Sequence, residues 1–278
     1  MKIGGKTKWV LLVSINPGGA NGGSATQYFI GDFDGKTFKN DNPSNEILWL
    51  DYGRDNYAGV TWSNAPNNRR IFLGWMSNWD YAQKVPTEKW RSAMTLPREL
   101  ALKQTEKGLR LVQNPVKETE SLRTNQFLGT KNFVMEKELN IGDGKNSLVE
   151  IDLEIDLSKT SAKEFGIGLS NSKGETNRIS FNTETRKFTS DRTNAGKKDF
   201  SDIFAKNKHF ASRLSNNNRL KLHLFFDKAS AEMFVDDGEV VMTDIFFPTE
   251  DFTKFKFYGN GEVFFTQSKA WNLKSIWR

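Results

Sequence analysis

Short apolar stretches bounded by turn residues constrain this fold more than any other feature. Residues 9–15 read Trp-Val-Leu-Leu-Val-Ser-Ile and stop at Asn16-Pro17-Gly18-Gly19, which predicts a buried strand followed by a loop. The same signal predicts strands at 27–31, 59–62 and 70–76. The Asp34-Gly35 pair favours the positive φ of a tight hairpin turn. Short strands at this spacing, without a long helical period, indicate an all-β chain and are typical of propeller blades.

The second half of the sequence alternates more strictly. Apolar and acidic residues alternate from 148 to 157, which predicts a strand with one face buried and the other in water. Three more strands are predicted at 220–226, 230–235 and 240–247, with a hairpin turn at Asp236-Asp237-Gly238. A two-sheet β-sandwich from about residue 126 to the end accounts for this pattern.

A short charged segment separates the two patterns. Residues 115–123 begin with Pro115, which suits the first position of a helix, and we interpret the segment as a connection. The predicted organisation is a partial five-bladed β-propeller over 1–118 (about the last two to three blades), a linker over 119–125, and a C-terminal β-sandwich over 126–278.

Composition excludes several classes of site. The sequence has no cysteine, so disulfides, thiol nucleophiles and Cys-based zinc sites are ruled out. It has two histidines: His209 follows Lys208, and His223 lies on the polar side of a predicted strand, where a solvated side chain is expected. A Ser-His-Asp triad or a His-based metal site would depend on one of them, so we expect neither a metal nor an organic cofactor.

The charge and hydropathy patterns also limit the partners. The net charge is +6, but the 40 basic residues are interleaved with 34 acidic ones. A nucleic-acid surface needs clustered cations, so none is expected. No stretch reaches the ~18 apolar residues of a membrane span, and the start of the chain has no signal-peptide pattern.

An ordered series of motifs carries a family resemblance. The segment 51–58 reads Asp-Tyr-Gly-Arg-Asp-Asn-Tyr-Ala, 74–79 reads Gly-Trp-Met-Ser-Asn-Trp, and 90–94 reads Trp-Arg-Ser-Ala-Met. Together with 14–35 and the tail from 226 to 235, this series resembles glycoside hydrolase family 32, the β-fructosidases of levanase, exo-inulinase and invertase type. The resemblance covers essentially the whole chain and implies the end of the propeller followed by the family's C-terminal sandwich.

The motifs that carry catalysis in the family do not occur here. The family uses an Asp nucleophile in Asn-Asp-Pro-Asn-Gly, a Glu acid/base in Glu-Cys, and an Asp in Arg-Asp-Pro that holds the fructosyl ring. Retaining hydrolysis needs the two reacting carboxyls ~5 Å apart. The segment 40–43 (Asn-Asp-Asn-Pro) has an inserted residue, and Arg54-Asp55-Asn56 lies inside another motif, so we interpret both as chance matches. The sequence is expected to begin just after the Glu-Cys position, and no catalytic residue is assigned.

Five residues are candidates for substrate binding: Trp75, Tyr57, Asp51, Asn78 and Trp79. The residues alone favour core packing for Trp75 and Tyr57; the resemblance favours the pocket for Trp75 and leaves both readings open for Tyr57. Asp51 is expected either to bind sugar hydroxyls or to fix its own turn through Gly53. Asn78 and Trp79 are expected at the pocket rim. For Trp90 and Arg91, a stacked pair is preferred to a rim position.

The resemblance implies a retaining exo-β-fructosidase that acts on levan, inulin or sucrose, with this chain inactive alone. Two rivals stay open: a non-catalytic fructan-binding protein and a structural β-sandwich protein. A cut propeller exposes strand edges, so self-association through these edges is possible, and residues 1–118 are expected to be less stable than the sandwich. The full-length protein is expected in the periplasm or outside a bacterial cell.

Overall fold

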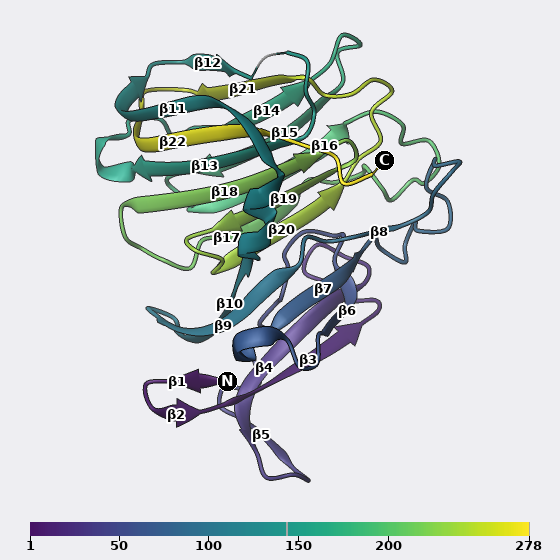
Figure 1. The fold of residues 1–278 in the computed structure, drawn as a ribbon, viewed down its shortest axis with the longest axis vertical. Helices are drawn as coiled ribbons and strands as arrows, with labels where there is room; N and C mark the ends of the chain where they lie inside the picture. Colours follow the sequence, from purple (N-terminus) through teal and green to yellow (C-terminus); the bar gives the residue numbers. More distant parts are fainter. Residues whose placement is uncertain (143, 278) are drawn as a thin grey trace.

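The computed structural model describes residues 1–142 and 144–277, and it confirms an all-β chain. Figure 1 shows a larger C-terminal region, residues 123–273, stacked on a smaller N-terminal region, residues 1–115. Within the described residues, helix is limited to three 3-10 segments, and no helix is long and apolar enough to cross a membrane. These segments are η1 (Pro66–Asn68), η2 (Lys117–Leu122) and η3 (Leu157–Lys159).

Two six-stranded antiparallel sheets form the C-terminal region. Their strands run in the orders β11-β22-β13-β18-β19-β20 and β12-β21-β14-β15-β16-β17. The first sheet contains β11 (Arg123–Met135), β13 (Val149–Asp156), β18 (Arg219–Asp227), β19 (Ser230–Val235), β20 (Val240–Ile245) and β22 (Val263–Leu273). The second contains β12 (Glu138–Ile141), β14 (Glu164–Ser170), β15 (Thr176–Asn182), β16 (Lys187–Asn194), β17 (His209–Ser212) and β21 (Lys254–Gly259).

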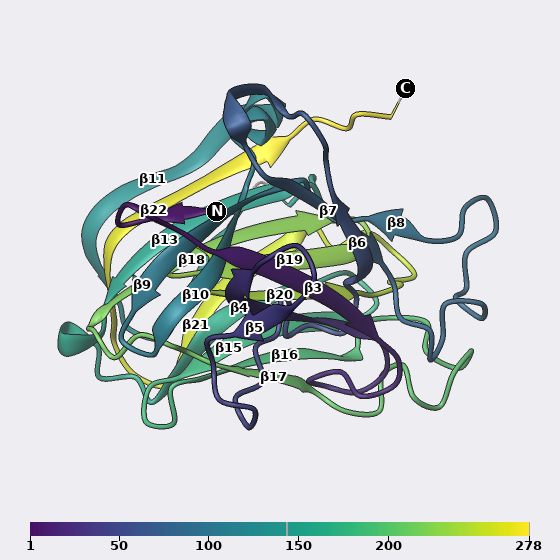
Figure 2. The same cartoon turned by 90° about the horizontal axis from the view of Figure 1, so that it is seen from below.

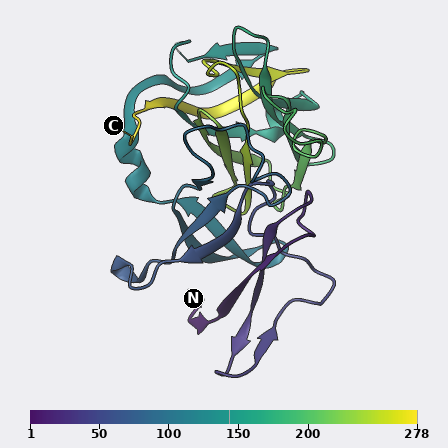
Figure 3. The same cartoon turned by 90° about the vertical axis from the view of Figure 1, so that its right-hand side faces the viewer.

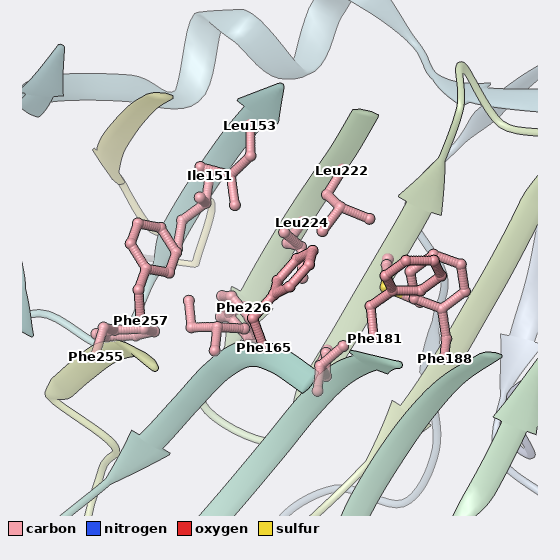
Figure 4. Close-up of a cluster of buried hydrophobic side chains, with 14 of the residues drawn as sticks. Ile151, Leu153, Phe165, Phe181, Phe188, Leu222, Leu224, Phe226, Phe255 and Phe257 are labelled. Atoms are coloured by element: carbon pink, nitrogen blue, oxygen red, sulfur yellow. The ribbon is translucent and has the colours of Figure 1, made fainter. Parts of the chain in front are cut away.

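An apolar core fills the space between these two sheets. The period-2 alternation of each strand turns every second side chain inward, so Ile151 and Leu153 of β13 meet the rings of Phe165 and Phe257 from the opposite sheet (Figure 4). Each of these four side chains is at most 3% exposed. Full burial of one such side chain contributes about 1.5–3 kcal/mol, so this core is the main source of stability in the region.

The acidic face of β13 is not in water throughout, which corrects the expectation from its alternation. Glu150 is fully buried, and its carboxylate accepts hydrogen bonds from Arg123 Nε at 2.8 Å and Nη2 at 2.6 Å. His223 Nε2 lies 2.7 Å from the same carboxylate, so this histidine is also partnered rather than simply solvated. Burial would raise the pKa of Glu150, but the hydrogen bonds from Arg123 and His223 lower it below its usual value.

Three sheets form the N-terminal region. One has the order β3-β4-β5, and another the order β10-β9-β7-β6 with β8 beside β7. The strands are β1 (Lys2–Ile3), β2 (Lys6–Thr7), β3 (Trp9–Ile15), β4 (Ala25–Phe33), β5 (Phe38–Asn40), β6 (Tyr57–Thr61), β7 (Ile71–Met76), β8 (Ala93–Met94), β9 (Arg98–Thr105) and β10 (Gly108–Pro115), with β1 and β2 forming the small third sheet. A separate apolar cluster holds the two larger sheets together, with Ile30, Leu50 and Phe72 at its centre.

Both predicted Asp-Gly turns are confirmed. Asp34 Oδ1 accepts hydrogen bonds from the backbone nitrogens of Lys36 and Thr37, and Gly35 has a φ of +97° between β4 and β5. The connection after β10 differs from its prediction in one respect. Pro115 is the last residue of β10, paired with Arg98, and the helix begins at Lys117, so the proline ends a strand instead of starting a helix.

The N-terminal region packs against β20, the edge strand of the first six-stranded sheet (Figures 2 and 3). Backbone nitrogens of Tyr52 and Asp55 donate to the carbonyls of Val241 and Thr243, at 2.8 and 3.0 Å. A Cβ at Gly53 would lie 2.1 Å from the Thr243 carbonyl oxygen, so only glycine allows this approach. All six residues of β20 are therefore buried.

Candidate functional site

Three of the five candidate residues form a continuous row of aromatic rings. Tyr57 of β6 pairs with Trp75 of β7, and their ring centroids are 6.3 Å apart at an interplanar angle of 63°. Trp79, in the turn after β7, lies 5.0 Å from Trp75. Trp79 is 49% exposed, while Tyr57 and Trp75 are half-buried. We call these three residues the aromatic row.

A β-bulge sets the geometry of the row. The β6–β7 register shifts between Tyr57 and Val60, and Ala58 has a φ of +48°. A bulge bends its strand and redirects a side chain, and here Tyr57 meets the edge of Trp75. An exposed series of rings can pack on the apolar face of a sugar ring, with polar neighbours taking the hydroxyls.

Asn78 is fully buried and holds the turn that carries Trp79. Its Oδ1 accepts from the backbone nitrogens of Ser24 and Asp80, at 3.2 and 3.1 Å, and its Nδ2 donates to the carbonyls of Ser24 and Arg54, at 3.2 and 2.8 Å. These bonds occupy the amide. Asn78 precedes Trp79 in sequence, but its side chain lies inside the protein and not at an exposed rim.

Asp51 lies in the junction between the two regions and is 3% exposed. Its Oδ1 accepts from Gly53 N at 2.8 Å, the turn-fixing bond that was one of its two expected roles. Asn56 Nδ2 also donates to this carboxylate, at 3.1 Å. Three further hydrogen bonds come from far along the chain: Arg98 Nη1 at 2.9 Å, and the nitrogen and hydroxyl of Thr243 at 2.9 and 2.6 Å. Arg98 also binds Glu232 at 2.7 Å, so Asp51 belongs to a buried ionic cluster and not to the aromatic row.

Asp55 lies in a second buried cluster. It is fully buried, and its carboxylate accepts from Arg192 Nη1 at 2.6 Å, from the Tyr81 hydroxyl at 2.6 Å and from Ile245 N at 2.9 Å. Burial raises the pKa of the Tyr81 hydroxyl well above its usual value, so this group stays protonated and donates a hydrogen bond to Asp55.

Three acidic residues could be suspected of catalysis, and each is paired with a different cation. Asp41 lies 2.8 Å from Lys8 at the surface, Asp51 binds Arg98, and Asp55 binds Arg192. Retaining hydrolysis needs one ionised and one protonated carboxyl facing the same bond.

Within the described part of the chain, no group of three or more His, Asp or Glu side chains is placed to hold a metal ion.

His209, which follows Lys208 in sequence, is buried and paired. Its Nδ1 lies 2.6 Å from Asp244 Oδ1, and both residues are at most 2% exposed. Burial would raise the pKa of Asp244, but the charge and hydrogen bond of His209 lower it to about 2, aided by Arg192 and Ser190. A substrate cannot reach a pair enclosed in this way, so it supplies no hydrolytic triad.

Trp90 and Arg91 do not form the expected stack. Arg91 Nη2 donates to the carbonyls of Val85 and Thr87, both at 3.3 Å, and Trp90 lies 6.5 Å from the ring of Phe247. The guanidinium thus binds carbonyls of the 83–87 loop, and hydrogen bonds from a charged donor are stronger than those between neutral groups.

Sequence reasoning missed the arginines that organise the junction. Arg192 occupies an inward position of β16, on the same face as the buried Phe188 and Ser190. Arg98 and Glu232 are likewise fully buried or nearly so within strands. One signal could have identified these residues. Each is a charged residue on the buried face of a strand, and a buried charge needs a partner of opposite charge.

Comparison with known proteins gives a consistent result. Residues 1–115 match the family model "Glycosyl hydrolases family 32 N-terminal domain", and residues 118–272 match "Glycosyl hydrolases family 32 C terminal". The levanase of Bacillus subtilis (strain 168) is 40% identical over 274 residues, which cover 97% of this chain and 40% of the levanase. The extracellular exo-inulinase of Aspergillus awamori is 35% identical over 260 residues, covering 89% of this chain and 48% of the inulinase.

A solved structure agrees with the sequence matches. The crystal structure of exo-inulinase from Aspergillus awamori superposes with a TM-score of 0.88 at 30% identity, over 99% of this chain and 55% of the inulinase chain. This chain thus spans about half or less of the length of these relatives. The two family models together match nearly all of it. The chain belongs to glycoside hydrolase family 32.

Proposed function

We propose that this chain is part of a retaining exo-β-fructosidase that releases terminal fructosyl units from levan, inulin or sucrose. In this proposal residues 1–118 are the end of a five-bladed propeller that carries the active site, residues 119–125 are a linker, and residues 126–278 are a β-sandwich. The reacting Asp and Glu come from sequence other than these 278 residues, so the chain alone is inactive.

One observation carries the proposal. The aromatic row ends in the exposed Trp79, with the half-buried Trp75 and Tyr57 behind it, whereas Asp41, Asp51 and Asp55 are each neutralised by a cation. A surface that can receive a sugar ring, without a free pair of carboxyls, fits part of a glycosidase pocket. The names of the relatives, levanase and exo-inulinase, support fructans as the substrate class.

The first experiment is to incubate the chain with levan, inulin and sucrose and to measure released fructose. No release is expected. Clear turnover would contradict the assignment of the reacting carboxyls to other sequence, and Asp41→Asn, Asp51→Asn and Asp55→Asn would then identify the group responsible.

A chimera tests the positive half of the proposal. The chain replaces the matching 274-residue segment of the Bacillus subtilis levanase. We expect the chimera to hydrolyse levan, and Trp79→Ala in the chimera to weaken this activity. A folded chimera that binds levan without releasing fructose would favour a non-catalytic fructan-binding protein, and one that neither binds nor cleaves would favour a structural role.

Exposed apolar residues lie on strands at the edges of the N-terminal sheets. Trp9 and Leu11 of edge strand β3 are 53% and 43% exposed, and Val60 of edge strand β6 is 63% exposed. Unpaired apolar edges favour pairing with another chain, so we propose that the chain self-associates through them or is completed by another polypeptide. Light scattering should give a mass above 31.7 kDa; a monomer at all concentrations would contradict self-association.

A further inference from the structure

The turn that presents Trp79 is short and held at both ends. Ala82 N donates to the Asn78 carbonyl at 2.8 Å, and Trp79 N donates to the Ser24 hydroxyl at 3.1 Å. On the other side of Trp79, Asp80 forms an ion pair with Arg54. The indole is thus the one large side chain of this turn that points to solvent, while its neighbours anchor the backbone.

Tyr81 is the anchor that reaches the C-terminal region. Its hydroxyl donates to Asp55 Oδ1 at 2.6 Å and accepts from Arg192 Nη2 at 2.8 Å. Arg192 belongs to β16, a strand of the second six-stranded sheet. A residue 111 positions away in sequence therefore fixes the turn of Trp79 by way of one phenol group.

Arg192 has no freedom to move in this arrangement. Its Nε donates to the Phe204 carbonyl at 3.0 Å and its Nη1 to the Ile245 carbonyl at 2.8 Å, in addition to Asp55 at 2.6 Å. The guanidinium stacks on the Phe204 ring at 4.1 Å, and that ring meets Tyr81 edge-on at 5.0 Å. Side chains locked by packing and by several hydrogen bonds hold a site to the accuracy that ligand binding needs.

We propose that Arg192 is a positioning residue for the aromatic row: from β16 it holds Tyr81, and thereby the turn that presents Trp79 to Trp75. The consequence for sugar recognition rests on the proposed function. In that setting the C-terminal region sets the shape of the fructan-facing surface, although none of its own side chains belongs to the aromatic row.

The test is fluorine NMR of the full 278-residue chain labelled with 5-fluorotryptophan. Trp79→Phe and Trp75→Phe assign the two resonances. Tyr81→Phe removes the hydroxyl link but keeps the ring, and Arg192→Lys keeps a charge for Asp55 but loses the bond to Tyr81. Both variants are expected to shift or broaden the Trp79 and Trp75 signals and to leave that of Trp271 in place.

Two matched variants separate positioning from general loosening. Tyr28→Phe removes the hydroxyl of another buried tyrosine, which accepts from Leu111 N at 3.4 Å. Arg213→Lys alters a buried arginine paired with Asp236 at 2.6 Å. Neither should move the Trp79 signal. The proposal is overturned if Tyr81→Phe leaves Trp79 unchanged, or if these two matched variants move it as much; should Arg192→Lys fail to fold, Tyr81→Phe alone decides.

Adding levan oligosaccharides separates this proposal from the proposed function. If the Trp79 signal of the unsubstituted chain ignores levan while Tyr81→Phe still moves it, positioning stands and sugar binding by the row fails. If levan shifts the signal, Tyr81→Phe should raise the apparent Kd about tenfold, equivalent to ~1.4 kcal/mol. If Tyr81→Phe changes neither the Kd for levan nor the Trp79 signal, the positioning role is wrong.

Discussion

The two large internal interfaces of this protein differ in composition: one is apolar, and the other combines apolar packing with buried ion pairs. Between the two six-stranded sheets, the contact surface is hydrocarbon, with Leu224 and Phe226 of β18 among rings from the facing sheet (Figure 4). Between the N-terminal and C-terminal regions, two buried ionic clusters centred on Arg98 and Arg192 lie beside apolar side chains from both regions. The apolar cluster comprises Met76, Tyr81, Val85, Phe204, Ile245 and Phe247.

The difference teaches how each interface is specified. An apolar core tolerates many sequences of suitable volume, because burial is non-directional. A buried ion must meet its partner with good geometry, because an unpaired one costs several kcal/mol. The sheet-to-sheet core therefore supplies stability, whereas the junction fixes the one orientation in which the aromatic row is held.

Removing the central cation of the junction should have the largest effect. Arg98→Met leaves Asp51 and Glu232 buried without their common partner, so we expect the free energy of unfolding to fall by about 3–5 kcal/mol. Urea unfolding measures this loss. Arg219→Met, which breaks the exposed pair with Glu154, should cost less than ~0.5 kcal/mol. If Arg98→Met lowers the free energy of unfolding by less than ~1 kcal/mol, the ionic cluster does not have the importance that this comparison gives it.

Truncation in the apolar core should come next. Leu224 is fully buried between the sheets, and Leu224→Ala should cost about 3 kcal/mol through lost burial and the cavity left behind. The same urea titration measures it, and Leu224→Met should recover most of the loss, because the volume is nearly restored.

Acid should weaken the junction before it weakens the core. Asp244 has a pKa lowered from 3.8 to about 2 in the folded chain. A carboxyl whose folded pKa is depressed stabilises the fold above its unfolded pKa, and this contribution disappears as pH falls through the folded value. The contribution of Asp244, about 2 kcal/mol, should therefore be lost between pH ~5 and ~2. Asp55 acts in the opposite direction, because burial raises its pKa in the folded chain.

The variant Asp244→Asn isolates the contribution of the Asp244 carboxylate to this pH dependence. It should be less stable than the unsubstituted chain at pH 7, and its unfolding free energy should fall less steeply in acid. Parallel pH profiles for the two proteins would show that the His209–Asp244 pair contributes nothing to the acid response.

Local features were predictable from the sequence. The alternation at 148–157 gave β13, and the turns at Asp34-Gly35 and Asp237-Gly238 gave two hairpins, since each depends on neighbours within a few residues. The motifs of 51–58 and 74–79 gave the family, whereas the pairing of Tyr57 with Trp75 on adjacent strands is known only from the structure.

The junction was not predictable, because its partners are distant. Asp51 meets Thr243 across 192 positions, and Asp55 meets Arg192 across 137. An Asp in a turn motif has the same local pattern whether its oxygens meet a sugar, water or a buried arginine. Glu150 is a second example. The alternation of its strand predicts on which side of the sheet Glu150 lies, but not that Arg123 and His223 cover that side.

The smallest effect on stability is expected where the effect on recognition is largest. Trp79 is 49% exposed, and Trp75 is its one ring contact within the described part of the chain, so Trp79→Ala should change the free energy of unfolding by ~0.5 kcal/mol or less. Trp62, which is 46% exposed at the end of edge strand β6, offers a matched variant, Trp62→Ala. If the aromatic row receives the sugar, levan binding in the chimera should weaken for Trp79→Ala and stay unchanged for Trp62→Ala, with both proteins equally stable in urea. Equal loss of binding in the two variants would mean that exposed indoles bind levan without a defined site, and a large loss of stability for Trp79→Ala would make the row part of the structural core.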